Sequence, residues 1–64
     1  MSEIPQYLDE RQVARMIGRA VQTLRNDRHK GQGLPYVKFG RLVRYSVQDV
    51  YVFMESHRVE VSNL

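Results

Sequence analysis

The side chains with the most evident chemistry lie close together in the first half of the chain. At about 100° per residue of a helix, Gln22, Thr23, Asn26 and Lys30 share one side, with Arg25 at its border. An Asn amide can bond both a donor and an acceptor of adenine, and a Thr methyl group can contact the methyl group of thymine. This set is therefore suited to base-pair edges, although a plain solvated helix face would have the same pattern.

Cationic side chains around this set are candidates for phosphate contacts. Arg19 and Lys30 bracket the segment and could clamp phosphates. Gln22 lies near the predicted start of the helix, where a phosphate contact is as suitable as a base contact. Arg25 could reach a phosphate or a guanine, or pack as a border residue.

A second basic group follows at Lys38, Arg41 and Arg44. Arg41 falls at a predicted turn, and arginine is favoured in narrow minor grooves of DNA. Lys38 and Arg44 are better suited to phosphates. The alternative is a charged strand edge that only prevents aggregation.

The formal net charge of +3 on 64 residues hides an asymmetry along the chain. Residues 11–44 hold nine Lys or Arg and one Asp, a net charge of +8, whereas the other residues hold one Arg and six acidic residues, a net charge of −5. Such an oriented field suits a polyanion on one face. Chance clustering on a solvated surface is the alternative.

The composition of this chain argues against several other classes. It contains no Cys, which excludes a disulfide framework, a Cys-ligated zinc site and thiol catalysis within it, and suits a cytoplasmic protein. Its longest apolar run, 50–54, is far below the roughly 20 residues of a membrane span. His29 and His57 have no third ligand in an evident pattern, so we expect no metal and no cofactor. We find no set of acid, base or nucleophilic side chains that would converge on one site, so the sequence does not indicate an enzyme.

Caps and spacing predict three helices and a hairpin. Asp9 followed by Gln12 is a capping-box pattern, and Ser46 followed by Asp49 is a second. Glycines follow the first two predicted helices and end them cheaply, because glycine adopts positive φ. Alternating apolar and cationic residues predict two strands joined at Gly40-Arg41. The expected elements are helices over residues 10–17, 21–30 and 47–57 and a β-hairpin over residues 36–45.

Apolar spacing predicts which faces form the core. The hairpin is expected to have a basic outer face and an apolar inner face of Val37, Phe39, Val43 and Tyr45. The hydroxyl group of Tyr45 is expected at the surface. The core stripe of the last helix is expected to be Val47, Val50, Tyr51, Phe53 and Met54.

Two helices joined by a tight turn and followed by a basic hairpin form a helix-turn-helix with a wing. The segments that carry a family resemblance are Tyr7-Leu8-Asp9-Glu10 with Val13-Ala14, Ile17-Gly18, Thr23-Leu24-Arg25-Asn26, Gly33-Leu34-Pro35, Tyr36-Val37-Lys38-Phe39-Gly40, Val43-Arg44-Tyr45, and the helix from Asp49 to Met54. In this order they resemble the winged helix-turn-helix domains of phage-type excisionases and AlpA-like regulators, which are related to the MerR DNA-binding domain. The resemblance covers about residues 7–57.

Three positions depart from the family pattern. Ala20 stands where the family usually has a Ser or Thr cap. Asp27 stands where an aromatic or apolar residue is common, and Leu42 where a basic residue is common in the wing. The missing cap costs about 1 kcal/mol of helix stability, and Leu42 makes the wing less basic than usual.

The resemblance implies a mainly α fold with a small β-hairpin, arranged as helix–turn–helix–hairpin wing–helix over residues 7–57. A flexible lead-in over residues 1–6 and a tail over residues 58–64 are expected to flank it. In the family, the second helix reads the major groove and the wing contacts the backbone or minor groove. The predicted recognition-helix residues are Arg19, Gln22, Thr23, Arg25, Asn26 and Lys30, and the predicted wing residues are Lys38, Arg41 and Arg44.

The function expected from this resemblance is non-catalytic, sequence-specific binding of double-stranded DNA. The chain would be an excisionase, or recombination directionality factor, that binds repeated sites, bends DNA and assists an integrase in excising a mobile element. The expected partners are DNA, an integrase and further copies bound head to tail, with no membrane, in a bacterial or phage-infected cytoplasm at the nucleoid. The alternatives are a small transcriptional regulator of the same fold, or a protein-interaction module that docks through its acidic ends and Val59, Val61 and Leu64.

Overall fold

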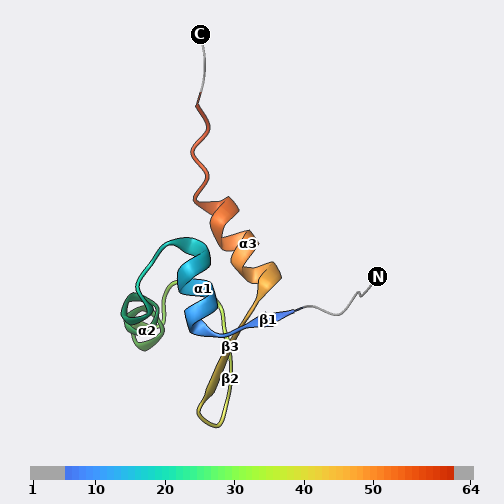
Figure 1. Ribbon diagram of the computed structural model, residues 1–64. Helices are drawn as coiled ribbons and strands as arrows, with labels where there is room; N and C mark the ends of the chain where they lie inside the picture. The colour runs from blue at the N-terminus through green and yellow to red at the C-terminus, as the bar shows by residue number, and fades with distance from the viewer. Residues whose placement is uncertain (1–5, 62–64) are drawn as a thin grey trace.

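The computed structural model describes residues 6–61, which form three helices and a three-stranded antiparallel sheet whose β2–β3 hairpin projects beyond the helices (Figure 1). The elements in chain order are β1 (Tyr7–Leu8), α1 (Glu10–Ile17), α2 (Val21–Lys30), β2 (Val37–Phe39), β3 (Leu42–Ser46) and α3 (Val47–Ser56). The strand order in the sheet is β1-β3-β2. The chain is therefore a small mixed α/β domain with one strand more than the predicted hairpin.

Some of the expectations for the chain ends fall on residues 1–5 and 62–64, which lie outside the described residues. They include most of the predicted lead-in and the docking role of Leu64. Residues 58–61 are exposed. No helix within the described range is long and apolar enough to cross a membrane.

The first two helices begin and end where the sequence predicts. The capping box at α1 is confirmed: the Gln12 N–H donates to Asp9 Oδ1 at 2.8 Å, and the Asp9 N–H donates to Gln12 Oε1 at 2.9 Å. Gly18 ends α1 in the left-handed region with φ 74°. At the start of α2, Ala20 makes no side-chain cap, because alanine has no acceptor.

The strand β1 was not predicted, and it changes how α3 begins. Tyr7 pairs with Ser46, and Leu8 pairs with Tyr45. The Val47 N–H then donates to the carbonyl oxygen of Gln6 at 2.9 Å. Ser46 is the N-cap residue of α3, as predicted, but its side chain makes no capping hydrogen bond. A backbone acceptor on the neighbouring segment satisfies the first N–H of α3 instead.

The pairing register of the hairpin overturns the predicted faces. The structure pairs Val37 with Arg44, Lys38 with Val43, and Phe39 with Leu42, around the two-residue connection Gly40-Arg41. Directly paired residues point to the same face of a sheet. Val43 and Tyr45 therefore share the inner face with Lys38, while Val37 and Phe39 lie on the outer face with Arg44. A face that is only apolar opposite a face that is only basic does not form.

The buried core joins all three helices to β3 and to the loop after α2. It consists of Val13, Ala14, Leu24, Leu34, Tyr45 and Val50. The ring of Tyr45 is 1% exposed and its hydroxyl group accepts a hydrogen bond from Arg28, so the prediction of a surface hydroxyl is wrong. The buried hydroxyl group is tolerated because it has a charged donor.

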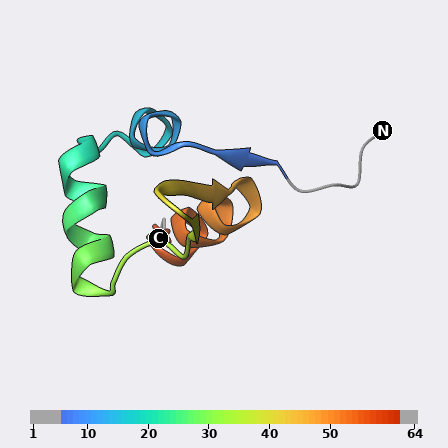
Figure 2. The same cartoon turned by 90° about the horizontal axis from the view of Figure 1, so that it is seen from below.

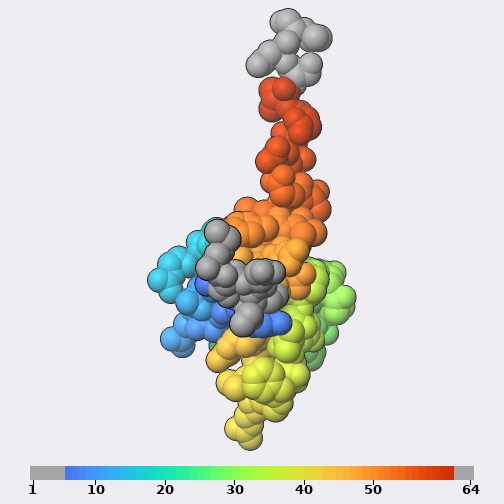
Figure 3. All heavy atoms as spheres, turned by 90° about the vertical axis from the view of Figure 1, so that its right-hand side faces the viewer, coloured from blue at the N-terminus to red at the C-terminus, as the bar shows by residue number. Residues whose placement is uncertain are grey.

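The last helix contributes less to the core than its sequence suggested. It ends at Ser56, one residue before the predicted end. Val50 is buried and Phe53 packs against the core, but Tyr51 is 58% exposed and Met54 is 44% exposed. Figures 1 and 3 show why: α3 leads away from the rest of the molecule, so its far end has no neighbouring element. The predicted stripe is therefore only half buried.

Replacing Gly33 with Ala should lower the free energy of unfolding by about 2 kcal/mol. Gly33 has φ 85°, and a Cβ atom there would lie 3.0 Å from the Cβ atom of Asp27, so backbone strain and crowding add. Gly18→Ala is the matched control, since nothing lies within 4 Å of its added Cβ and only the strain remains, about 1 kcal/mol. Urea unfolding measures both variants. Equal losses of stability in the two variants would show that the Asp27 side chain moves away from the added methyl group without an energetic cost.

Candidate nucleic-acid interface

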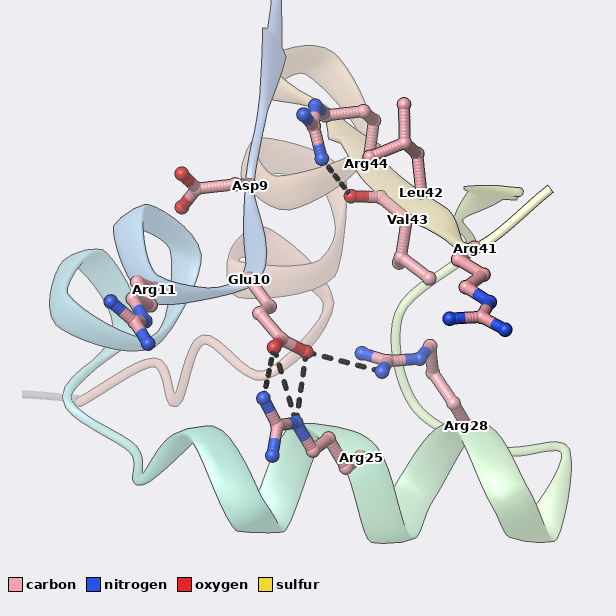
Figure 4. Close-up of a pocket in the computed structure, with 9 residues that line it drawn as sticks. All are labelled: Asp9, Glu10, Arg11, Arg25, Arg28, Arg41, Leu42, Val43 and Arg44. Atoms are coloured by element: carbon pink, nitrogen blue, oxygen red, sulfur yellow. Dashed lines mark hydrogen bonds and ion pairs between the residues drawn. The ribbon is translucent and has the colours of Figure 1, made fainter. Parts of the chain in front are cut away.

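A basic groove lies between α2, the hairpin and the start of α1 (Figure 4). Five of its nine lining residues are arginines, whereas two are acidic. A second hollow adjoins it and shares Arg25, Arg28, Arg41 and Val43 with it. We call the two hollows together the basic groove; the lining residues are Asp9, Glu10, Arg11, Arg25, Arg28, Arg41, Leu42, Val43 and Arg44, joined by His29, Tyr36, Lys38 and Gly40.

An ion-pair network on Glu10 joins α1 to α2 inside this groove. Arg25 grips the carboxylate with one edge of its guanidinium group, donating from Nη2 at 2.6 Å and from Nε at 3.1 Å to Oε2. Arg28 donates from Nη2 to Oε1 at 3.1 Å. One carboxylate thus fixes two cations from successive turns of α2 (Figure 4). This role was not predicted, because Glu10 lies in the sequence among the acidic residues outside the basic stretch.

Arg28 has the more structural role of the two arginines in this network. Its side chain is 17% exposed, against 50% for Arg25. Arg28 donates from Nη1 to the Tyr45 hydroxyl group at 2.8 Å, and its guanidinium carbon lies 5.9 Å from the centre of the Tyr36 ring. It therefore ties α2 to β3, while Arg25 keeps the Nη1 end of its fork free of any partner in residues 6–61.

The hydrogen bonds from Arg25 and Arg28 hold the pKa of Glu10 below its ordinary value of 4.5, and the charge attraction of both guanidinium groups adds to this. Partial burial opposes the shift, because it disfavours the charged carboxylate. The net lowering means that the folded state binds the proton of Glu10 less readily than the unfolded state does. Stability contributed by this charge is therefore full above about pH 4.5 and is lost as the pH falls through the lower pKa of the folded chain.

Replacing Glu10 with Gln should lower the free energy of unfolding at pH 7 by about 1–2 kcal/mol, because two arginines lose their ionic acceptor. The difference between the parent and E10Q chains should shrink as the pH falls below about 4.5. Urea titrations between pH 7 and pH 3 measure it. Glu55→Gln is the control, since the Glu55–Arg58 pair is 64% and 60% exposed and should change stability little at any pH. A loss for E10Q that does not vary with pH would contradict the ionic role.

The outward side of α2 carries the predicted recognition residues, next to the groove. Gln22 Nε2 donates to Asn26 Oδ1 at 3.0 Å, and both side chains are exposed, while Thr23 is half-buried. Arg19 and Lys30 are exposed at the two ends of the helix. None of these five lines the basic groove; of the predicted α2 set, only Arg25 does. Figure 2 shows α2 as the outermost element on its side of the molecule.

The three predicted wing cations all line the groove but differ in freedom. Lys38 and Arg41 are exposed, and Arg41 sits in the turn. Arg44 is half-buried and donates from Nη1 to the carbonyl oxygen of Val43 at 2.8 Å. The structure thus brings Arg25 of α2 to the same hollow as the wing cations.

No family model, curated protein or solved structure matches this chain. Within residues 6–61 no three His, Cys, Asp or Glu side chains lie close enough together to hold a metal ion. The chemistry available at the groove is therefore that of its cations, its carboxylates and the amides beside it. Such a surface can bind a polyanion and donate hydrogen bonds to it.

Proposed function

We propose that this chain binds double-stranded DNA as a winged helix-turn-helix protein, with α2 as recognition helix and the β2–β3 hairpin as wing. The observation that carries the proposal is the basic groove between these two elements. Its walls hold Arg25 on one side and Lys38 and Arg41 on the other. A phosphate backbone running along the groove would meet cations from both walls.

The outward side of α2 would supply base recognition. Asn26 Oδ1 accepts one hydrogen bond from Gln22, and within residues 6–61 its NH₂ group has no partner, so the amide can still pair with the edge of an adenine. The bond from Gln22 also holds the Asn26 amide in one orientation, which lowers the entropy lost on binding. Arg19 and Lys30, exposed at the ends of the helix, would hold the flanking phosphates.

The resemblance to excisionases supports a finer proposal. The chain would act as a recombination directionality factor that bends DNA and helps an integrase to excise a mobile element. A transcriptional regulator with the same interface is the alternative. An excision assay with the cognate integrase separates them, because only a directionality factor should be required for the reaction.

Asn26→Ala should lower the preference for a selected site by about 1–3 kcal/mol while leaving binding to unrelated duplexes nearly unchanged. The site is first selected by the parent chain from a pool of random-sequence duplexes, and both affinities are then measured by fluorescence anisotropy. Gln48→Ala removes an exposed amide from α3 and is the matched control. An equal loss on the selected and the unrelated duplex would contradict base reading by Asn26.

Exposed apolar side chains of α3 and the segment after it favour a second candidate, a protein-interaction module. Tyr51, Val52 and Val59 are 58%, 62% and 80% exposed. A module that acts only through this surface would keep its effect on excision when Asn26 and Arg41 are both replaced with Ala. A DNA-binding protein would lose it.

A further inference from the structure

The outer face of the sheet carries an apolar pair at the tip of the hairpin. Phe39 and Leu42 are directly paired across β2 and β3 and flank the Gly40-Arg41 turn. Their side chains are 58% and 46% exposed. A large phenyl ring held half in water at the end of a hairpin gains little from folding. We call Phe39 and Leu42 the tip pair.

Cations surround the tip pair. Arg41 lies between its two members in the chain, and Arg44 lies on the same face two residues after Leu42. Leu42 itself lines the basic groove beside Arg25 and Arg41, and in Figure 4 its side chain points to the opposite side of β3 from Val43. The partner of this tip must therefore accept apolar and cationic contacts within a few ångströms of each other.

Duplex DNA offers that combination at a base step. Its phosphates meet cations along the edge of the minor groove, while the stacked faces of the bases are apolar. Apolar side chains such as Phe and Leu, pushed between two base pairs from the minor groove, unstack them and kink the duplex. The hairpin is shaped for such an approach, since its tip projects away from the helices at the end of the molecule opposite α3 (Figures 1 and 3).

We propose that the tip pair is a wedge that enters a base step of the minor groove, guided by Arg41, and that it is the source of DNA bending by this chain. The inference rests on the proposed DNA-binding function and adds the residues and the mode of deformation. It also assigns a role to Leu42, which is paired with Phe39 across the hairpin. A second apolar residue beside Phe39 widens the wedge.

The position of the pair explains why the rest of the outer face is not part of the wedge. Val37 is also exposed, at 43%, but it lies two residues farther from the turn on the same strand. A side chain that far from the tip would meet the groove wall rather than the base step, because each residue of a strand advances about 3.3 Å. Val37 therefore provides a matched control on the same face.

The test uses a duplex that the parent chain selects from a random-sequence pool, with a donor and an acceptor dye on its two ends. The bend angle is measured by energy transfer, and 2-aminopurine at each adenine of the footprint reports unstacking. We expect the parent chain to bend the duplex and to raise the fluorescence at one step. Phe39→Ala with Leu42→Ala should reduce the bend at least about twofold and abolish the rise, with affinity kept within about tenfold. Val37→Ala should behave as the parent.

Three outcomes would overturn the wedge. They are a parent chain that binds a straight, stacked duplex, a double variant that keeps the bend, and a Val37→Ala variant that loses as much of the bend as the double variant. In each case DNA binding still stands. If the pool yields no bound duplex, the proposed function fails and the wedge with it. The single variants Phe39→Ser and Leu42→Ser, with circular dichroism spectra of all variants, separate a lost wedge from a lost fold.

Discussion

Raising the salt concentration from about 50 to about 200 mM should weaken binding of this chain to duplex DNA about 10³-fold. Each phosphate that a cation neutralises releases counterions, and the logarithm of the affinity falls with the logarithm of the salt concentration by about 0.9 per contact. The cations of the proposed interface would supply about six contacts. They are Arg19 in the turn before α2, Arg25 and Lys30 on α2, and Lys38, Arg41 and Arg44 of the hairpin. Anisotropy titrations at four salt concentrations give the slope.

Substitutions in the hairpin measure how much of that slope the hairpin contributes. The double variant Lys38→Gln, Arg41→Gln should lower the slope by the equivalent of about two phosphate contacts, because both parent side chains are exposed on the groove wall. Arg58→Gln is the matched control, since Arg58 lies after α3 and is paired with Glu55 at 2.9 Å. An affinity that hardly changes with salt would contradict the DNA-binding proposal. A slope reduced as much by the control would place the contacts elsewhere on the molecule.

The parts of the fold that depend on neighbours in sequence were predictable. The capping box of Asp9 and Gln12 and the glycines at positions 18 and 31 fixed α1 and α2 at the predicted residues. These signals act within four or five residues, through side chains that bond their own helix end or a backbone that tolerates positive φ. No tertiary contact is needed to place them.

Features that depend on pairing between distant segments were not predictable. Two residues of β1 have too little periodicity to reveal a strand, and they form one only because β3 offers them a partner. The faces of the hairpin follow from register, and a shift of one residue exchanges them. The hairpin register was nevertheless available from the sequence, because the predicted connection Gly40-Arg41 already pairs Phe39 with Leu42. That pairing puts Val37 and Phe39 on the outer face with Arg44, which the expectation from alternation alone overlooked.

In the candidate site, too, some features could be predicted from the sequence and others could not. Its cations stand in the sequence, and their clustering between residues 11 and 44 is visible without a structure. The role of Glu10, whose carboxylate binds two of these cations, cannot be seen in the sequence, because Glu10 lies fifteen residues from Arg25 and eighteen from Arg28. An ion pair across two helices requires the angle between them, which the buried contacts of the core decide. The only sequence signal was the acidic pair Asp9-Glu10 at the edge of a strongly basic stretch.

Leu24→Ala should lower the free energy of unfolding by about 3 kcal/mol. Leu24 is 3% exposed and is the one fully buried side chain of α2, so its removal leaves a cavity where α2 meets the core. Because a core of this size rarely supplies more than about 3–5 kcal/mol in total, a large part of the variant should be unfolded at 37 °C. Thermal and urea unfolding followed by circular dichroism measure the loss.

The same variant tests whether DNA binding requires the folded chain. The apparent association constant of L24A for DNA should equal that of the parent multiplied by the folded fraction of L24A. Excess DNA should raise the melting temperature of L24A, because a ligand that binds only the folded state stabilises that state by mass action. Val52→Ala is the matched control: Val52 is 62% exposed on α3, and its loss should change stability by no more than about 0.5 kcal/mol. If DNA raised the melting temperature of neither the parent nor L24A, the folded chain would not bind DNA, and the DNA-binding proposal would fail.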